Sequence, residues 1–88
     1  MDPRGTNGRL NTAVAQVLSD ARTAAGVSTR QLSDLTGISH RTLMRYLYDE
    51  RAIDMSRLYA ISMALGMAPH DVVVRASEIL AAEDAAQA

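Results

Sequence analysis

The sequence predicts an all-α fold, a compact bundle of five short helices, from its length, composition and apolar spacing. A chain of 88 residues has the length of one domain, with a core near the lower size limit for independent stability. Its fifteen alanines and nine leucines are strong helix formers. The aromatic residues that favour strands are limited to three tyrosines. Apolar residues recur at helical spacing, and turn-forming residues divide them into short segments.

The first predicted helix follows a breaker-rich segment. Residues 1–8 contain Pro3 and two glycines and no apolar anchor, so we expect a flexible N-terminal arm there. The helix then starts at residue 9 and ends at Gly26, a residue type favoured just after a helix. Its apolar stripe consists of Leu10, Val14, Val17, Leu18 and Ala21.

Two short capped helices come next. Ser28 and Gln31 form a capping box at the start of the second helix, which ends at Gly37 after barely two turns. Ser39 is the N-cap candidate of the third helix, predicted over residues 39–48. That helix directs Leu43, Tyr46 and Leu47 inward.

The fourth and fifth helices begin at Asp54, an N-cap residue, and at Pro69, which suits a first turn. The fourth ends at Gly66, and its inward side is predicted to hold Met55, Leu58, Tyr59, Ser62 and Leu65. The fifth runs to about Leu80, before an alanine-rich tail that we expect to fray. These boundaries divide the chain into the arm, a domain over residues 9–68 and a C-terminal helix over residues 69–88.

The segment from Ser28 to Tyr48 has the pattern of a helix-turn-helix formed by the second and third helices. Two helices that cross steeply over a short turn need a small residue where they approach, and Ser33 stands there. The turn needs a residue that tolerates a left-handed backbone, and Gly37 supplies it. The apolar anchors of the pair are Leu32, Ile38, Leu43 and Tyr46.

Several short fragments stand in a fixed order and spacing between residues 18 and 73. They are Ala21-Arg22, Gly26, Ser28, Leu32-Ser33, Gly37-Ile38-Ser39, Thr42-Leu43, Leu58, Ile61 and Ala64-Leu65-Gly66. In this order the sequence resembles the Cro/cI-like (XRE) family of helix-turn-helix repressors, of the phage-repressor type. The resemblance implies a lambda-repressor-like domain of five helices that binds DNA, usually as a dimer, and regulates transcription.

The sequence departs from the family pattern at three positions. Thr29 stands where the family often has a phosphate-clamping glutamine, and Asp49 stands where a glycine commonly closes the third helix. Leu47 replaces a glutamate that commonly pairs with the arginine corresponding to Arg22. We therefore expect Arg22 to reach Asp49 or Glu50, or to be solvated.

The third helix is the candidate recognition helix, which enters the major groove with its N-terminal residues toward the base edges. Arg41 and Arg45 share one face, and arginine is the commonest reader of guanine; on an ordinary helix both would simply be solvated. Met44 contacts a thymine methyl group or packs inside. The candidate base-reading residues are His40, Arg41, Met44 and Arg45. The candidate phosphate contacts are Ser28, Thr29, Arg30, Ser39, Thr42, Tyr48 and Arg51, the last from the family's layout.

The last helix has more apolar surface than a small bundle needs. One interpretation is that it packs against a second copy of the chain and so sets the half-site spacing of the DNA. The other is packing within the chain to about Leu80. The dimerisation candidates are Val72, Val73, Ala76, Ile79 and Leu80.

Charge is distributed unevenly along a chain whose net charge is −1. Residues 4–57 carry eight arginines against five acids, whereas residues 58–88 carry one arginine, Arg75, against four acids. The predicted recognition helix contains no acid. We therefore expect the basic part to face DNA and the acidic last helix to point away from it.

These observations favour a sequence-specific transcriptional regulator, of repressor type, that binds a palindromic double-stranded DNA operator as a homodimer. The alternative is an antitoxin-type protein that binds a toxin partner and its own promoter, and an antirepressor is another candidate protein partner. No catalytic arrangement is visible, so we expect no enzyme. Without cysteine, and with His40 and His70 thirty residues apart, we expect neither a metal site nor a cofactor. The absence of a membrane span or signal peptide predicts a cytoplasmic protein.

Overall fold

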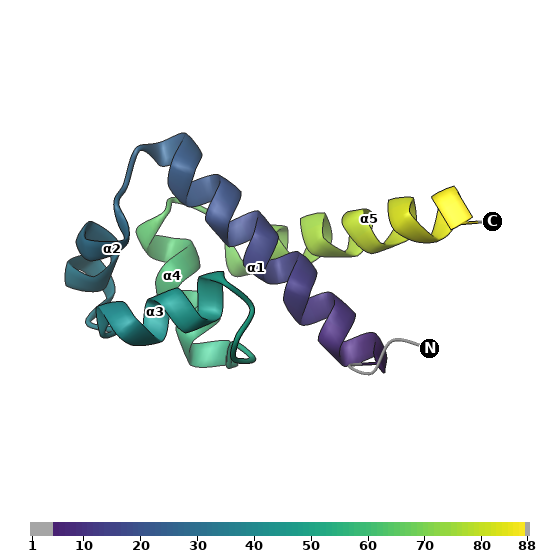
Figure 1. The fold of residues 1–88 in the computed structure, drawn as a ribbon. Coiled ribbons are helices and arrows are strands. Elements are labelled where there is room, and N and C mark those ends of the chain that lie inside the picture. The colour runs from purple at the N-terminus through teal and green to yellow at the C-terminus, as the bar shows by residue number, and fades with distance from the viewer. Residues whose placement is uncertain (1–4, 88) are drawn as a thin grey trace.

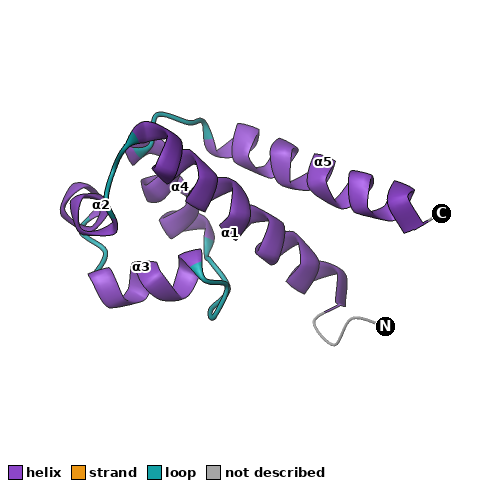
Figure 2. Cartoon of the chain, turned by 45° about the horizontal axis from the view of Figure 1, so that its top comes forward, coloured by secondary structure: helices purple, strands orange, loops and turns teal. Residues whose placement is uncertain are grey.

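The computed structural model describes the backbone of residues 5–87 (Figure 1). Burial is described from residue 8 onward. Within this range the chain forms five α-helices and no strand, as predicted. Helix α5 runs antiparallel beside α1 (Figures 1 and 2). Helix α3 packs against α1 and α2, and α4 packs against α2 and α5. None of the described helices is long and apolar enough to cross a membrane. Their bounds are Gly5–Ala25 for α1, Thr29–Thr36 for α2, His40–Leu47 for α3, Met55–Ala64 for α4 and Pro69–Gln87 for α5.

Each helix contributes one large, fully buried aliphatic side chain to the core. In chain order they are Leu18, Leu32, Leu43, Ile61 and Val72. Burial of each contributes about 1.5–3 kcal/mol relative to exposure. Since every helix places one such residue at a common centre, no helix of this small bundle is dispensable.

The inward face of α4 differs from the prediction. Met55 is 81% exposed and Tyr59 is 59% exposed, whereas Leu58, Ile61 and Ser62 are buried. The buried residues follow the i, i+3, i+4 spacing of a single helix stripe. Met55 lies in the first turn of α4, and Tyr59 is rotated away from that stripe. The prediction was wrong for these two residues because apolar character alone does not determine which side of a short helix meets the core.

Both ends of the described chain are more helical than predicted. Helix α1 starts at Gly5 rather than residue 9, and α5 continues to Gln87 instead of fraying after Leu80; residues 1–4 of the expected arm lie outside the described part. The extension of α5 is tied to α1, because the Arg9 guanidinium donates a hydrogen bond of 2.8 Å to the Asp84 carboxylate.

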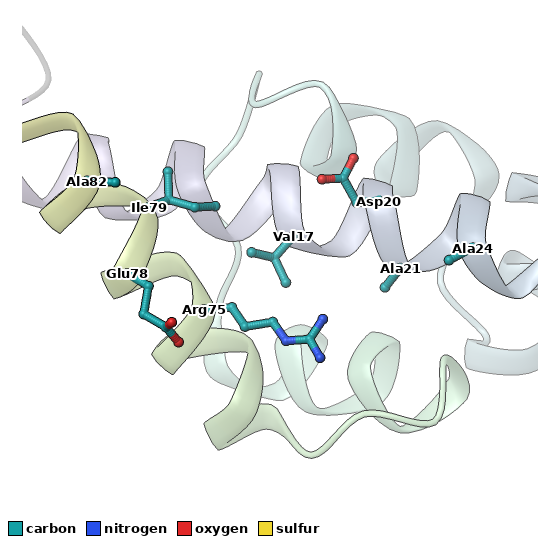
Figure 3. A pocket seen from close by; sticks show the side chains of 8 residues that line it. All are labelled: Val17, Asp20, Ala21, Ala24, Arg75, Glu78, Ile79 and Ala82. Atoms are coloured by element: carbon teal, nitrogen blue, oxygen red, sulfur yellow. The ribbon is translucent and has the colours of Figure 1, made fainter. Parts of the chain in front are cut away.

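A shallow groove of about 510 Å³ runs between α1 and α5. Arg75 lies over it while Glu78 leaves α5 in another direction (Figure 3). Among the described residues neither of the two forms an ion pair. The groove is lined by Val17, Asp20, Ala21, Ala24, Arg75, Glu78, Ile79 and Ala82.

Helix α3 ends in the same Schellman motif as α1 and α4, but with an aspartate at the left-handed position. The Glu50 amide donates to the Arg45 carbonyl at 2.8 Å, and the Asp49 amide donates to the Tyr46 carbonyl at 3.2 Å. Asp49 has φ of 58°, while Gly26 and Gly66 have the positive φ at the ends of α1 and α4. A non-glycine residue in this conformation costs about 1–2 kcal/mol, so the exit of α3 requires compensation from elsewhere.

Replacing Leu43 by alanine should lower the free energy of unfolding by about 2–5 kcal/mol, because the fully buried side chain would leave a cavity. Leu35→Ala is the matched control, since Leu35 of the neighbouring helix is 63% exposed. Urea denaturation measures both. Equal losses for the two leucines would contradict this assignment of the core.

Asp54 caps α4 and gives a pH-dependent contribution to stability. The pKa of its carboxyl group is held below the ordinary 3.8, chiefly because the carboxylate accepts a hydrogen bond from the Arg57 amide. Because the pKa of Asp54 is lower in the folded chain, its ionised carboxylate contributes fully to the free energy of unfolding above pH 3.8. This contribution is lost as the pH falls through the pKa of the folded state. The stability difference between the wild-type chain and Asp54→Ala should therefore shrink on acidification, as measured by urea denaturation at several pH values. A difference independent of pH would show that the charge is unimportant.

Candidate nucleic-acid interface

Helix α2 begins at the predicted capping box. The Ser28 hydroxyl accepts a hydrogen bond of 3.0 Å from the Gln31 amide, and the Gln31 side chain accepts one of 2.7 Å from the Ser28 amide. The two bonds satisfy amides that would otherwise lack a partner at the helix start. They fix the direction in which α2 leaves α1.

The turn between α2 and α3 confirms the predicted roles of its small residues. Gly37 adopts a left-handed backbone with φ of 75°, and its amide donates to the Ser33 carbonyl at 2.9 Å. The Ser33 hydroxyl donates a hydrogen bond of 2.6 Å to the Ile38 carbonyl. Ser33 is therefore both small enough for the close approach of the helices and a partner for the turn backbone.

Helix α3 places its apolar and basic side chains on different faces. Leu43 and Tyr46 are buried, while Arg41 and Arg45 are exposed one turn apart. Within the part of the chain that the structure describes, no carboxylate pairs with either arginine. His40 is half-buried at the first position of the helix. The outer face of α3 thus presents two uncompensated guanidinium groups to solvent.

A small cleft of about 120 Å³ joins the start of α2 to the end of α3. Three of the predicted contact residues, Thr29, Met44 and Tyr48, line it together. Met44 is half-buried, whereas Tyr48 is 67% exposed. The cleft is completed by Ser19, Arg22 and Leu47, so no acid lines it.

The remaining phosphate-contact candidates differ in what their side chains already bind. The Ser39 hydroxyl accepts from the Thr42 amide at 3.2 Å and donates to the Thr42 hydroxyl at 2.9 Å. Thr42 therefore keeps its own hydroxyl proton for another acceptor. Ser28 likewise keeps its proton, because it acts as an acceptor in the capping box. Arg30 and Arg51 are exposed.

Arg22 reaches neither Asp49 nor Glu50, and its side chain is half-buried rather than fully solvated. One terminal nitrogen of its guanidinium donates a hydrogen bond of 2.8 Å to the Val27 carbonyl, and its buried Nε atom has no hydrogen-bond partner among the described residues. The Asp49 carboxylate is instead bound by side chains of α1. The guanidinium of Arg22 thus borders the cleft as an additional positive charge. The leucine at position 47, in place of a glutamate, was the signal that Arg22 lacks a carboxylate partner.

The structure contradicts two of the dimerisation candidates. Val72 and Ala76 are fully buried in the core of the chain itself, against α1 and α4. Both therefore stabilise the single copy, as the alternative interpretation stated. Val73 is exposed, and Ile79 and Leu80 are half-buried beside the core. In residues 8–87, no group of histidine, aspartate or glutamate side chains is placed to hold a metal ion.

The short helix α2, the glycine turn and the exposed basic face of α3 define a helix-turn-helix DNA-binding domain. The family model of the Cro/C1-type helix-turn-helix DNA-binding domain matches residues 17–78, more than two thirds of the chain. The chain belongs to this family.

Comparison with solved structures supports the same fold. The chain is similar to the crystal structure of the clp gene regulator ClgR from Corynebacterium glutamicum, with a TM-score of 0.81. The two are 24% identical, and the match covers 89% of this chain and 83% of that one. A comparison with curated proteins found no match.

Gly37→Ala should lower the free energy of unfolding by about 1–2 kcal/mol, because an alanine is strained at positive φ. No atom lies within 4 Å of an added Cβ atom, so the loss would report backbone conformation rather than a clash. Gly37→Asn is the control, since asparagine tolerates the left-handed conformation better. Thermal or urea denaturation measures the three chains, and an alanine chain as stable as the wild type would contradict the left-handed turn.

Proposed function

We propose that this protein is a sequence-specific transcriptional regulator that represses promoters by inserting α3 into the major groove of double-stranded DNA. The observation that carries the proposal is the exposed pair Arg41 and Arg45 on the outer face of a helix-turn-helix, with no carboxylate partner among the described residues. Unpaired basic groups on a packed helix attract the anionic duplex. Their position on the second helix of the motif matches the docking geometry of this class of domain.

Base recognition is assigned to the N-terminal and middle turns of α3. The two arginines bind the O6 and N7 atoms of guanine, each with about 1–3 kcal/mol of discrimination against other bases. Met44 packs against a thymine methyl group from the edge of the cleft. His40, at the helix start, completes the base-reading set. Half-sites that contain guanine are therefore expected.

Phosphate groups on either side of the groove are assigned to hydroxyls, amides and arginines around α3. Thr29 and Tyr48 bind a phosphate at the cleft, where the positive charge of Arg22 favours an anion. The amides at the start of α2 point in the direction suited to an anion. The further contacts are Ser28, Arg30, Ser39, Thr42 and Arg51.

Two copies of the chain bind one palindromic operator in this proposal. A recognition helix of eight residues spans only a few base pairs, so specificity in a genome requires two half-sites. In this class the half-sites lie about 34–36 Å apart, one turn of DNA. Of the dimerisation candidates on α5, those that remain for contact between copies are Val73, Ile79 and Leu80.

Selection of bound sequences from a random DNA library tests the proposal directly. The wild-type chain should enrich a guanine-containing palindrome. Arg41→Ala and Arg45→Ala should each weaken binding to that sequence by about tenfold or more, the loss of one good base contact. Arg75→Ala is the matched control, because Arg75 is an exposed arginine on α5.

Fluorescence anisotropy at fixed salt concentration measures these affinities. Failure to enrich any sequence would contradict specific DNA binding. Enrichment by the wild-type chain with full binding by both α3 variants would instead contradict the assigned orientation of the helix.

A further inference from the structure

The connection between α3 and α4 is tied to α1 by three hydrogen bonds. Asn11 donates through its side-chain amide to one Asp49 oxygen at 2.8 Å. The Thr12 hydroxyl donates to the other oxygen at 2.5 Å, a shorter contact than the 3.0 Å to its alternative acceptor, the Gly8 carbonyl. The Asn11 side-chain oxygen accepts a hydrogen bond of 2.9 Å from the Ile53 amide. We call Asn11, Thr12, Asp49 and Ile53 the α1 clamp. Its two ends enclose the exposed residue Arg51.

The clamp compensates for the unfavourable backbone at the exit of α3. Asp49 is an aspartate at φ of 58°, a conformation that an L-residue adopts only when other interactions hold it. Two charge-assisted hydrogen bonds from α1 to its carboxylate provide such interactions. A glycine would adopt this conformation at little cost. Asp49 is instead held in it by the hydrogen bonds from α1 to its carboxylate.

The clamp also determines where charges lie beside the recognition helix. Asp49 directly follows Tyr48, an exposed residue of the cleft. A carboxylate turned toward DNA at this point would repel the phosphate backbone. Its hydrogen bonds hold it against α1 instead, while the Ile53 amide fixes the far end of the loop that presents Arg51.

We propose that Asn11 and Thr12 are positioning residues for DNA binding, which act through Asp49 and Ile53 to place Tyr48 and Arg51 against backbone phosphates. This inference rests on the proposed function. Both residues are half-buried on α1, and they act at a distance from the base-reading face of α3. Leu43 and Tyr46 are buried in the core, so we expect α3 to stay folded when the clamp is broken. The clamp therefore sets the geometry of the phosphate contacts rather than the existence of the helix.

The test compares DNA binding by folded variants of the full chain, at a temperature where circular dichroism shows each to be folded. The probe is the duplex selected by the wild-type chain. Asn11→Ala and Thr12→Val should weaken binding by about tenfold, and the dependence of log K on log salt should become shallower by about one unit for each lost phosphate contact. Thr23→Val is the matched control, because Thr23 is an exposed α1 residue whose hydroxyl binds only the Ser19 carbonyl of its own helix. It should bind as the wild type does.

A second background tests whether Thr12 acts through Asp49. Asp49→Gly removes both the strained residue and the carboxylate, so Thr12→Val should cause no further loss of affinity in this background. An equal loss in both backgrounds would overturn the proposal, as would reduced stability with unchanged affinity and salt dependence. If Asn11→Ala does not fold, the nearly isosteric Thr12→Val decides the result. Absence of DNA binding by the wild-type chain would instead overturn the proposed function, and the positioning role with it.

Discussion

The structure depends on burial of the helix-turn-helix against the other three helices. Helices α2 and α3 have eight residues each, well below the roughly 12–15 residues at which an isolated helix is even marginally stable in water. They are helical here because Leu32 and Leu43 are fully buried among residues of α1, α4 and α5. The exposed basic face of α3 forms only when the opposite, apolar face of the same helix is packed in the core. Any change that loosens the core therefore also removes the proposed DNA-binding surface, without altering a residue that is proposed to contact DNA.

Local signals in the sequence were sufficient to predict most helix boundaries. Ser28, Ser39 and Asp54 cap the helices that they were predicted to cap, and Gly37 forms the left-handed turn. These features depend on residues three or four positions apart, so the sequence contains the whole interaction. The face of α3 was predictable for the same reason, because its apolar and basic residues alternate with helical periodicity.

Interactions between distant residues were not predictable in this way. Apolar periodicity did not reveal that Met55 and Tyr59 face solvent, because that depends on how α4 packs against α2 and α5. The partners of Asp49 are 37 and 38 positions away in the sequence, and no local pattern indicates them. The sequence predicted more apolar surface on α5 than the bundle needs, but two of the residues concerned, Val72 and Ala76, belong to the core. The position of Arg22 beside the cleft likewise needed the structure, although the missing glutamate at Leu47 indicated that its usual partner was absent.

The ion pair between Arg9 and Asp84 joins the beginning of α1 to the end of α5. In both ribbon views these two helix ends lie on the side of the molecule away from α2 (Figures 1 and 2). A fluorophore, a surface anchor or a fused protein attached at either terminus would extend away from the helix-turn-helix.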